Sequence, residues 1–132
     1  MSKKSEAKLW NLVKKLNNKY YFERIESPIG RGVPDVHGVI ENKIFWLELK
    51  ANSSKNYGIS KWQINWHVDY QRAGGLSFIL VAPLKERGLK LLAVNRDSRL
   101  VSLVTRTSSR TVNELELALR TTLGLPPRSS GA

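Results

Sequence analysis

The sequence contains no cysteine, which excludes disulfide bonds, zinc–thiolate sites, iron–sulfur clusters and thiol nucleophiles. It also has no apolar run near the ~18–20 residues of a membrane span, and its first residues lack the apolar segment of a secretory signal. We therefore expect a cytoplasmic protein that does not enter a membrane. Acidic residues are scarce too, with 11 Asp and Glu against 22 Lys and Arg, so the formal net charge is +11.

This positive charge is spread along the whole chain. Residues 1–66 contain 12 Lys and Arg, and residues 67–132 contain 10. A disordered basic arm would concentrate the charge, so we expect the basic residues on a folded surface. Such a surface attracts polyanions, and nucleic acid is the expected partner. A protein that is merely very soluble has the same composition, and that interpretation stays open.

A length of 132 residues suits a single domain, and hydrophobic periodicity indicates its elements. Helices are expected over residues 5–19, 60–73 and 113–123, and strands over 20–27, 35–40, 44–51, 76–82, 89–94 and 100–104. A Gly- and Pro-rich loop occupies residues 28–34, and a tight turn lies at 41–43. The order αβββαβ, followed by further strands and a last helix, predicts one mixed α/β domain over residues 1–132.

Three Glu-x-Lys triplets occur, which start at Glu6, Glu41 and Glu48. Only the third lies within an expected strand, where alternation places Glu48 and Lys50 on one face and the leucines beside them in the core. Two charged residues on a half-buried strand face are costly unless a cleft, a partner or a metal uses them. A surface ladder of cross-strand charges is the alternative interpretation.

Asp35 follows Gly32, Val33 and Pro34 and opens the strand that a short hairpin pairs with the Glu48 strand. This hairpin brings Asp35 close to Glu48, although an aspartate after proline is also an ordinary turn residue. Two carboxylates and the backbone carbonyl of Leu49 are hard oxygen ligands that suit Mg²⁺ or Mn²⁺. The Lys50 ammonium on the same rim can orient or activate a water molecule, or stabilise charge that develops on a phosphate.

The two histidines, His37 and His67, lack the spacing of zinc ligands, and we expect both to be structural. His37 lies two residues from Asp35, so an orientation towards the same cleft stays open.

The acidic residues and the lysine resemble the motif of the PD-(D/E)XK nuclease superfamily. The resemblance rests on Gly32-Val-Pro34-Asp35, then Trp46-Leu-Glu48-Leu-Lys50, then a helix that carries Gln63. The resemblance covers about residues 5–82. Within the superfamily, the chain is similar to the stand-alone VRR-NUC domains of phages and to Holliday junction resolvases. The resemblance implies a restriction-endonuclease-like core with a central mixed sheet flanked by helices, with residues 84–132 as accessory strands and a C-terminal helix. It also implies that Asp35 and Glu48 bind a metal and that Lys50 is the catalytic lysine.

The resemblance adds two further candidates for the site. An acid on the first helix often joins the site in such nucleases, and Glu6 is the only acid on that helix; VRR-NUC domains carry a glutamine where Gln63 stands. Glu6 is equally explained by the positive end of the helix dipole, and Gln63 by a capping box with Ser60.

Arg31, in the glycine-rich loop, is either a phosphate contact or a solvated arginine.

Together these features predict a Mg²⁺-dependent DNA endonuclease, with Mn²⁺ able to substitute and no organic cofactor. Residues 84–132 show no zinc finger or helix-turn-helix, which favours structure-selective cleavage, as by a Holliday junction resolvase, over site-specific cleavage of the homing type. The sequence is also compatible with a nuclease that acts on RNA and with a non-catalytic DNA-binding protein. Because one centre cuts one strand, we expect a homodimer, with the aromatic stripe of Trp62, Trp66 and Tyr70 packed on its own sheet or on a second copy.

Overall fold

The computed structural model describes residues 3–25 and 32–128. The helices are α1 (Lys3–Lys14), η1 (Lys15–Asn18, a 3₁₀ turn), η2 (Lys55–Gly58, also 3₁₀), α2 (Lys61–Arg72) and α3 (Val112–Thr122). The strands are β1 (Tyr21–Arg24), β2 (Val36–Ile40), β3 (Lys43–Lys50), β4 (Leu76–Val81), β5 (Lys90–Val94) and β6 (Val101–Arg106). Residues 26–31, which include Arg31, lie outside the described residues.

The six strands form one mixed sheet in the order β1-β2-β3-β4-β5-β6. Among the described strands, only β3 and β4 pair in parallel, and helix α2 connects them; the remaining neighbours are antiparallel. The turn between β2 and β3 has positive φ at Glu41 and Asn42, as a two-residue hairpin with right-handed strand twist requires. The prediction of a single α/β domain with a central mixed sheet flanked by helices is confirmed.

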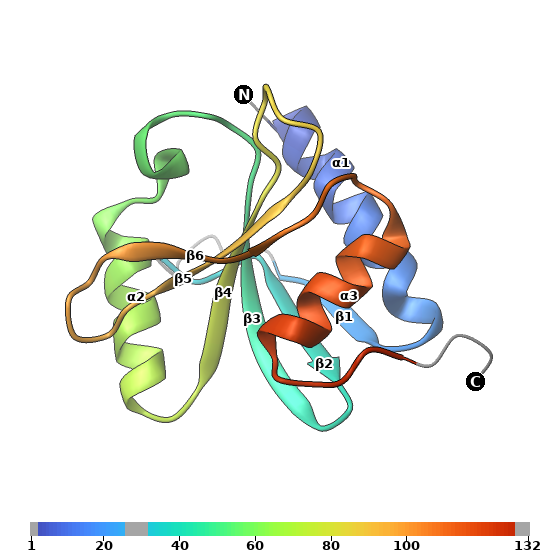
Figure 1. Cartoon of the computed structure of the whole chain (residues 1–132). Coiled ribbons are helices and arrows are strands. Elements are labelled where there is room, and N and C mark those ends of the chain that lie inside the picture. Colours follow the sequence, from blue (N-terminus) through green and yellow to red (C-terminus); the bar gives the residue numbers. More distant parts are fainter. Residues whose placement is uncertain (1–2, 26–31, 129–132) are drawn as a thin grey trace.

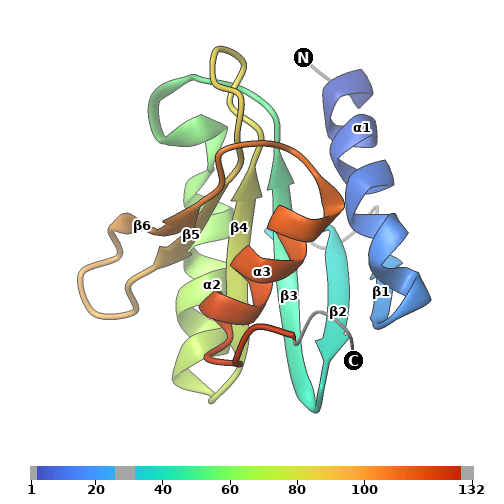
Figure 2. The ribbon, with the colours of Figure 1, turned by 45° about the vertical axis from the view of Figure 1, so that its right-hand side comes forward.

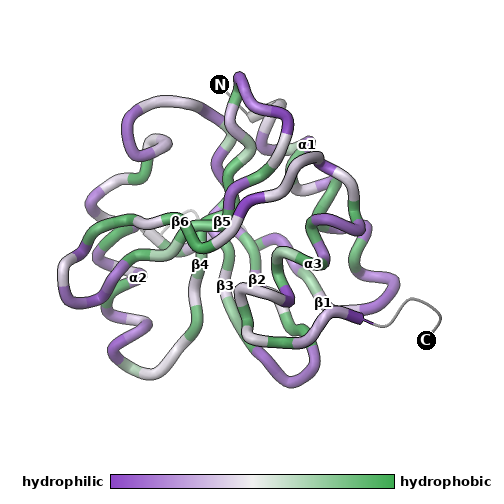
Figure 3. Tube along the Cα trace, viewed as in Figure 1, coloured by the Kyte–Doolittle hydropathy of each residue, from purple (hydrophilic) through white to green (hydrophobic). Residues whose placement is uncertain are grey.

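Helices cover both faces of the sheet, α1 and α3 one face and α2 the other (Figures 1 and 2). Hydrophobic residues gather along the strands, and the β2–β3 turn is hydrophilic (Figure 3). The larger core lies under α1 and α3 and includes Leu16, Phe45 and Leu119. A smaller core under α2 includes Val68 and Ile79. Because side chains alternate along a strand, β3 has one apolar face that packs towards α1 and a second face that carries charged side chains.

Residues 84–128 add two strands to the same sheet and a helix that packs on it. The predicted stripe of α3 is correct, because Leu115, Leu119 and Leu123 are all buried. Polar contacts also join α3 to the N-terminal half, since Glu116 accepts hydrogen bonds from Lys19 and from the Tyr20 hydroxyl. The C-terminal segment is therefore an integral layer of the fold.

The end of the first helix differs from the sequence prediction. The first helix was expected over residues 5–19, yet its α-helical part ends at Lys14 and the chain continues as η1. The reason lies at Asn17, whose side chain accepts a hydrogen bond from the backbone N–H of Phe22 and donates to the Phe22 carbonyl. These bonds tie the end of the helix to β1, and such local side-chain contacts compete with a regular helical turn.

Candidate active site

The β2–β3 hairpin places Asp35 beside Glu48. Val36 pairs with Leu47 in the antiparallel register, so the next pair outward is Asp35 with Glu48. The register is secured at its end, because the backbone N–H of Leu49 donates to Oδ2 of Asp35 at 2.9 Å. Leu49 itself points into the opposite core, where it is fully buried. The two carboxylates therefore stand on one face, as strand alternation predicts.

Glu48 is a buried carboxyl group, with 4% of its surface exposed. Its Oε2 accepts a hydrogen bond from Nε2 of Gln63 at 3.0 Å and lies 3.9 Å from Nζ of Lys50. Its Oε1 is buried and receives no hydrogen bond from an N–H or O–H group of the described residues, whereas the Asp35 carboxyl lies close enough to share a proton with Glu48. Burial and then the Asp35 carboxylate raise the pKa of Glu48 to about 9, against the lowering effect of Lys50. This site therefore holds a proton at neutral pH unless a cation takes the proton's place.

Gln63 forms the capping box that the sequence indicated and also contacts Glu48. It is the N3 residue of α2 and forms a capping box with Ser60, in which Oε1 of Gln63 accepts from the Ser60 N–H at 2.9 Å. The NH₂ group of the same side-chain amide, Nε2, donates to Oε2 of Glu48. One residue thus fixes the start of α2 and orients a carboxylate of the site.

Gly32 sets the distance between the Asp35 loop and α2. Its φ is +80°, and a Cβ built on it would lie 2.3 Å from the backbone oxygen of Trp62. Only glycine allows both this conformation and this close approach. The Gly-x-Pro-Asp pattern is therefore a packing requirement that brings Asp35 to the same place as Gln63.

Lys50 ends β3 with its side chain 13% exposed. Besides its proximity to Glu48, its Nζ donates to the carbonyl of Gly58 at 3.3 Å. Gly58 closes the turn η2, in which Asn56 and Tyr57 both have left-handed backbone conformations. The loop after β3 thus returns over the strand end and holds the lysine against the carboxylates.

Sequence analysis missed two residues that support this loop. The hydroxyl of Tyr57 accepts a hydrogen bond from Nζ of Lys90 at 2.9 Å, and Lys90 also pairs with Glu86 at 3.2 Å. Val81 pairs with both Lys50 and Lys90, so the two lysines flank it on the same face of the sheet. Lys90 is the only charged residue in an otherwise apolar strand, and this was the available signal.

Glu6 lies at the edge of the same site. It stands in the first turns of α1, is half-buried and is close enough to Asp35 for the two charges to interact. Burial raises the pKa of Glu6, Asp35 raises it further, and Lys50 and Arg24 act in the opposite direction. The structure thus brings all five candidate side chains, Glu6, Asp35, Glu48, Lys50 and Gln63, to one region.

The donor set suits a hard divalent cation. Within the described residues, no group of three or more His, Cys, Asp or Glu side chains is arranged to hold a metal ion, so an ion at this site would be held by the Asp35–Glu48 pair together with backbone oxygen. Oε1 of Glu48 is buried and receives no hydrogen bond from a donor group of the described residues, so it is available to bind a cation. The Leu49 N–H points towards Asp35. Because the N–H and C=O of one strand residue point to the same side, the Leu49 carbonyl also points to this side, where β2 has ended and leaves it unpaired by that strand. Two carboxylates and one carbonyl fit the preference of Mg²⁺ and Mn²⁺ for oxygen.

The aromatic candidates and His37 form a row on the same face as Glu48. The ring centroids of His37 and Trp46 are 5.1 Å apart, those of Trp46 and Trp66 6.0 Å, and those of Trp66 and Tyr70 4.7 Å. The aromatic stripe of α2 therefore packs partly on its own sheet, while Trp62 remains 47% exposed.

His67 is structural, as the sequence predicts. It is fully buried on α2, and its Nδ1 shares a hydrogen bond with the Ser77 hydroxyl at 2.6 Å. Burial lowers the pKa of His67 to about 4, so the ring is neutral at neutral pH.

Comparison with known proteins gives one kind of match. No protein-family model matches the chain, and no curated protein is similar to it in sequence. Among solved structures, the chain is similar to Hjc, a Holliday junction resolvase from the archaeal hyperthermophile Archaeoglobus fulgidus. The identity is 14%, the TM-score is 0.45, and the alignment covers 65% of this chain and 74% of that chain. At that level the match assigns no family, so the chemistry must come from the chain's own residues.

The structure also bears on the expectation about membranes. No helix in the described ranges, 3–25 and 32–128, is long and apolar enough to cross a bilayer.

Proposed function

We propose that the chain is a metal-dependent endonuclease that hydrolyses phosphodiester bonds of DNA at the Asp35–Glu48–Lys50 site. One observation carries the proposal: Glu48 is buried beside a second carboxylate, with one oxygen unpartnered and a lysine 3.9 Å from its second oxygen. A purely structural carboxyl group in a core would have its polar atoms satisfied, because an unpaired buried acceptor is destabilising. A site prepared for a cation, by contrast, leaves such an oxygen free.

Asp35, Glu48 and the Leu49 carbonyl would hold Mg²⁺ or Mn²⁺. Such an ion, when bound, supplies polarisation of the phosphate and lowers the pKa of water that it binds. Asp35 is held by the Leu49 N–H and Glu48 by Gln63, so both carboxylates keep their orientation. The Lys50 ammonium, held by Gly58, is placed to stabilise the additional negative charge on the phosphate as water attacks it.

The substrate class follows from charge. A net charge of +11 favours a polyanion, and two carboxylates beside a lysine suit hydrolysis of a phosphodiester. We propose structure-selective cleavage of branched DNA, as in a Holliday junction resolvase, because residues 84–128 contribute two strands and one helix and form no zinc finger or helix-turn-helix that would read a sequence. Site-specific cleavage of the homing type is the alternative within the same superfamily. Two cuts require two centres, so we propose a homodimer.

The proposal is tested with end-labelled four-way junction, linear duplex and RNA duplex, each incubated with Mg²⁺ or with excess EDTA. We expect cleavage of DNA in Mg²⁺ only, and paired symmetric nicks near the branch point of the junction. A single fixed cut in linear duplex would favour site-specific cleavage of the homing type, and cleavage of RNA alone would overturn DNA as substrate. Binding without cleavage under all conditions would identify a DNA-binding protein.

The dimer is tested separately by light scattering, without and with the junction. We expect twice the mass of one chain, and a monomer in both conditions would refute the dimer.

A further inference from the structure

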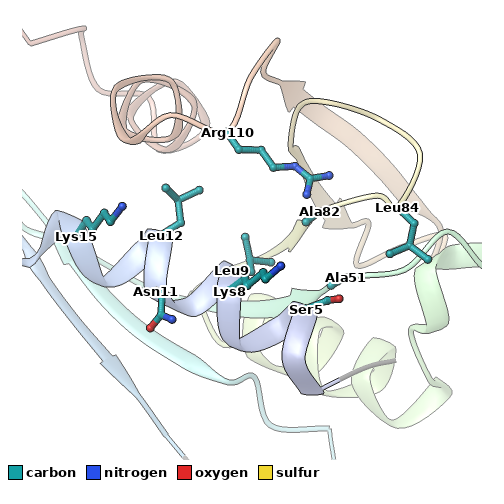
Figure 4. A pocket seen from close by; sticks show the side chains of 10 residues that line it. All are labelled: Ser5, Lys8, Leu9, Asn11, Leu12, Lys15, Ala51, Ala82, Leu84 and Arg110. Carbon is teal, nitrogen blue, oxygen red and sulfur yellow. The ribbon is translucent and has the colours of Figure 1, made fainter.

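A second feature lies on the opposite side of the sheet from Glu48. A cavity of about 410 Å³ opens between α1, the ends of β3 and β4, and the loop before α3 (Figure 4). Its volume lies within the range of about 300–1,000 Å³ that is typical of sites for small ligands. The residues that line it are Ser5, Lys8, Leu9, Asn11, Leu12, Lys15, Ala51, Ala82, Leu84 and Arg110.

The lining combines positive charge with an apolar floor. Lys8, Lys15 and Arg110 are cationic, and none of the described residues that line the cavity is acidic. Leu9, Ala51 and Ala82 are almost fully buried and form the floor, whereas Leu84 is 58% exposed at the rim. An apolar floor with a cationic rim is complementary to a nucleotide, whose base is apolar on its faces and whose phosphate is anionic.

Arg110 is held in place by the backbone. Its guanidinium donates to the carbonyls of Pro83 and Glu86 at 2.6 and 2.9 Å, and its Nε donates to the carbonyl of Gly88 at 3.3 Å. No carboxylate forms a salt bridge with it among the described residues, so its charge is not neutralised. Figure 4 shows its side chain reaching into the space above α1, on the side where Lys8 lies.

The cavity is close to the candidate active site along the chain. Ala51, in the floor, directly follows Lys50. Helix α1 contributes to both, since Glu6 interacts with Asp35 while Lys8 and Leu12 line the cavity. The cavity and the site are therefore linked through the end of β3 and the first turns of α1.

We propose that this cavity binds the phosphate and base of one nucleotide, either in a DNA strand that extends from the active site or as a free nucleotide. In taking DNA as the first source, the inference rests on the proposed function. Binding is independent of cleavage, however, so it is measured with EDTA present and its outcome does not depend on catalysis.

The test compares two charge insertions at exposed leucines. Leu84→Glu places a carboxylate at the rim of the cavity, whereas Leu100→Glu makes the same change at a residue that is 68% exposed and does not line it. Affinities for a labelled 20-nucleotide strand and for a four-way junction are measured over a range of salt concentrations, and binding of dAMP is measured by calorimetry. Because arginine removal would break three backbone contacts, Arg110 is left unchanged. Lys8→Ala provides a second variant, with Lys14→Ala, an exposed lysine of α1 outside the lining, as its control.

We expect Leu84→Glu to weaken DNA binding about five- to tenfold relative to Leu100→Glu. For each lost phosphate contact, the salt slope should fall by about 0.9 with the junction and by about 0.7 with the single strand. Lys8→Ala should weaken binding more than Lys14→Ala does. If dAMP binding alone is lost in Leu84→Glu, the free nucleotide is the occupant. Equal behaviour of Leu84→Glu and Leu100→Glu with every probe, and of Lys8→Ala and Lys14→Ala, would overturn the inference, even if the wild-type protein cuts DNA.

Discussion

Gln63 donates a hydrogen bond from Nε2 to Oε2 of Glu48, at a distance of 3.0 Å. The same side chain accepts from the backbone N–H of Ser60 and so belongs to the cap of α2. The start of a helix and the orientation of a candidate metal ligand are therefore linked through one amide. Substitutions at Gln63 and at Ser60 separate the contact with Glu48 from the helix cap.

Gln63→Ala should lower the cleavage rate about tenfold or more, since outer partners of metal ligands typically contribute 10- to 100-fold to activity or metal affinity. Ser60→Ala is the matched control, because it removes the side-chain acceptor of the cap and leaves the bond to Glu48 in place. Both variants should lose about 1 kcal/mol of stability from the cap. The measurements are the melting temperature and the single-turnover rate, and equal rates for the two variants would show that Gln63 only caps the helix.

Glu48→Gln should stabilise the metal-free protein while it abolishes cleavage. The pKa of Glu48 is about 9 in the folded protein and near 4.5 in the unfolded chain. Between pH 4.5 and pH 9, Glu48 is therefore protonated in the folded state and ionised in the unfolded state. Stability from this group is therefore present below pH 4.5 and falls as the pH rises towards 9. A neutral amide removes this loss, which amounts to about 1–3 kcal/mol at pH 7.

Denaturant titrations of wild type and Glu48→Gln in EDTA, at pH 5 and pH 8, measure this effect. The gain in stability should be larger at pH 8 than at pH 5. A gain that is independent of pH would contradict the assignment of Glu48 as the buried proton carrier.

Gly32→Ala should displace Asp35 as well as strain the backbone. The left-handed conformation alone costs about 1–2 kcal/mol for a residue with a Cβ. The new Cβ would also lie 2.3 Å from the Trp62 oxygen, so the Asp35 loop and α2 must separate. Gly124→Ala is the control, with φ of +74° and no atom within 4 Å of its Cβ. Both should lower the melting temperature, but only Gly32→Ala should reduce cleavage; equal cleavage by the two would argue against this role of the loop.

Lys50→Ala should lower the cleavage rate by roughly 10²-fold, as expected for a group that stabilises charge in the transition state. DNA affinity should change little, because Lys50 is one of 22 basic residues. Lys43→Ala, at the exposed start of the same strand, should cut at the wild-type rate. If Lys50→Ala also cuts at that rate, the lysine has no part in the chemistry.

The sequence was sufficient for the order of the elements because hydrophobic periodicity is strong in this chain. The alternation through Leu47, Glu48 and Leu49 separated a core face from a site face correctly. The pairing of Asp35 with Glu48 followed from hairpin geometry, since a two-residue turn leaves one natural register. The sequence offered the site and the capping box as alternatives for Gln63, and it gave no sign that the two ends of one amide make both contacts.

Several features depended on contacts between distant residues. The support of the Lys50 loop by Tyr57 and Lys90 joins residues separated by 33 positions, and no local pattern indicates it. The left-handed conformations of Asn56 and Tyr57 are likewise set by the return of the chain over β3. The early end of α1 depends on the contact of Asn17 with Phe22 of the next strand.

The most direct test of the central claim compares Asp35→Asn with Asp69→Asn, an exposed aspartate of α2. Single-turnover cleavage of a labelled four-way junction is measured in Mg²⁺, and binding of the same junction is measured in EDTA. We expect Asp69→Asn to cut at the wild-type rate and Asp35→Asn not to cut, while Asp35→Asn binds DNA as tightly as wild type or more tightly because a negative charge near phosphate is removed. Cleavage by Asp35→Asn at the wild-type rate, or by the wild type in excess EDTA, would contradict a metal-dependent nuclease site at Asp35 and Glu48.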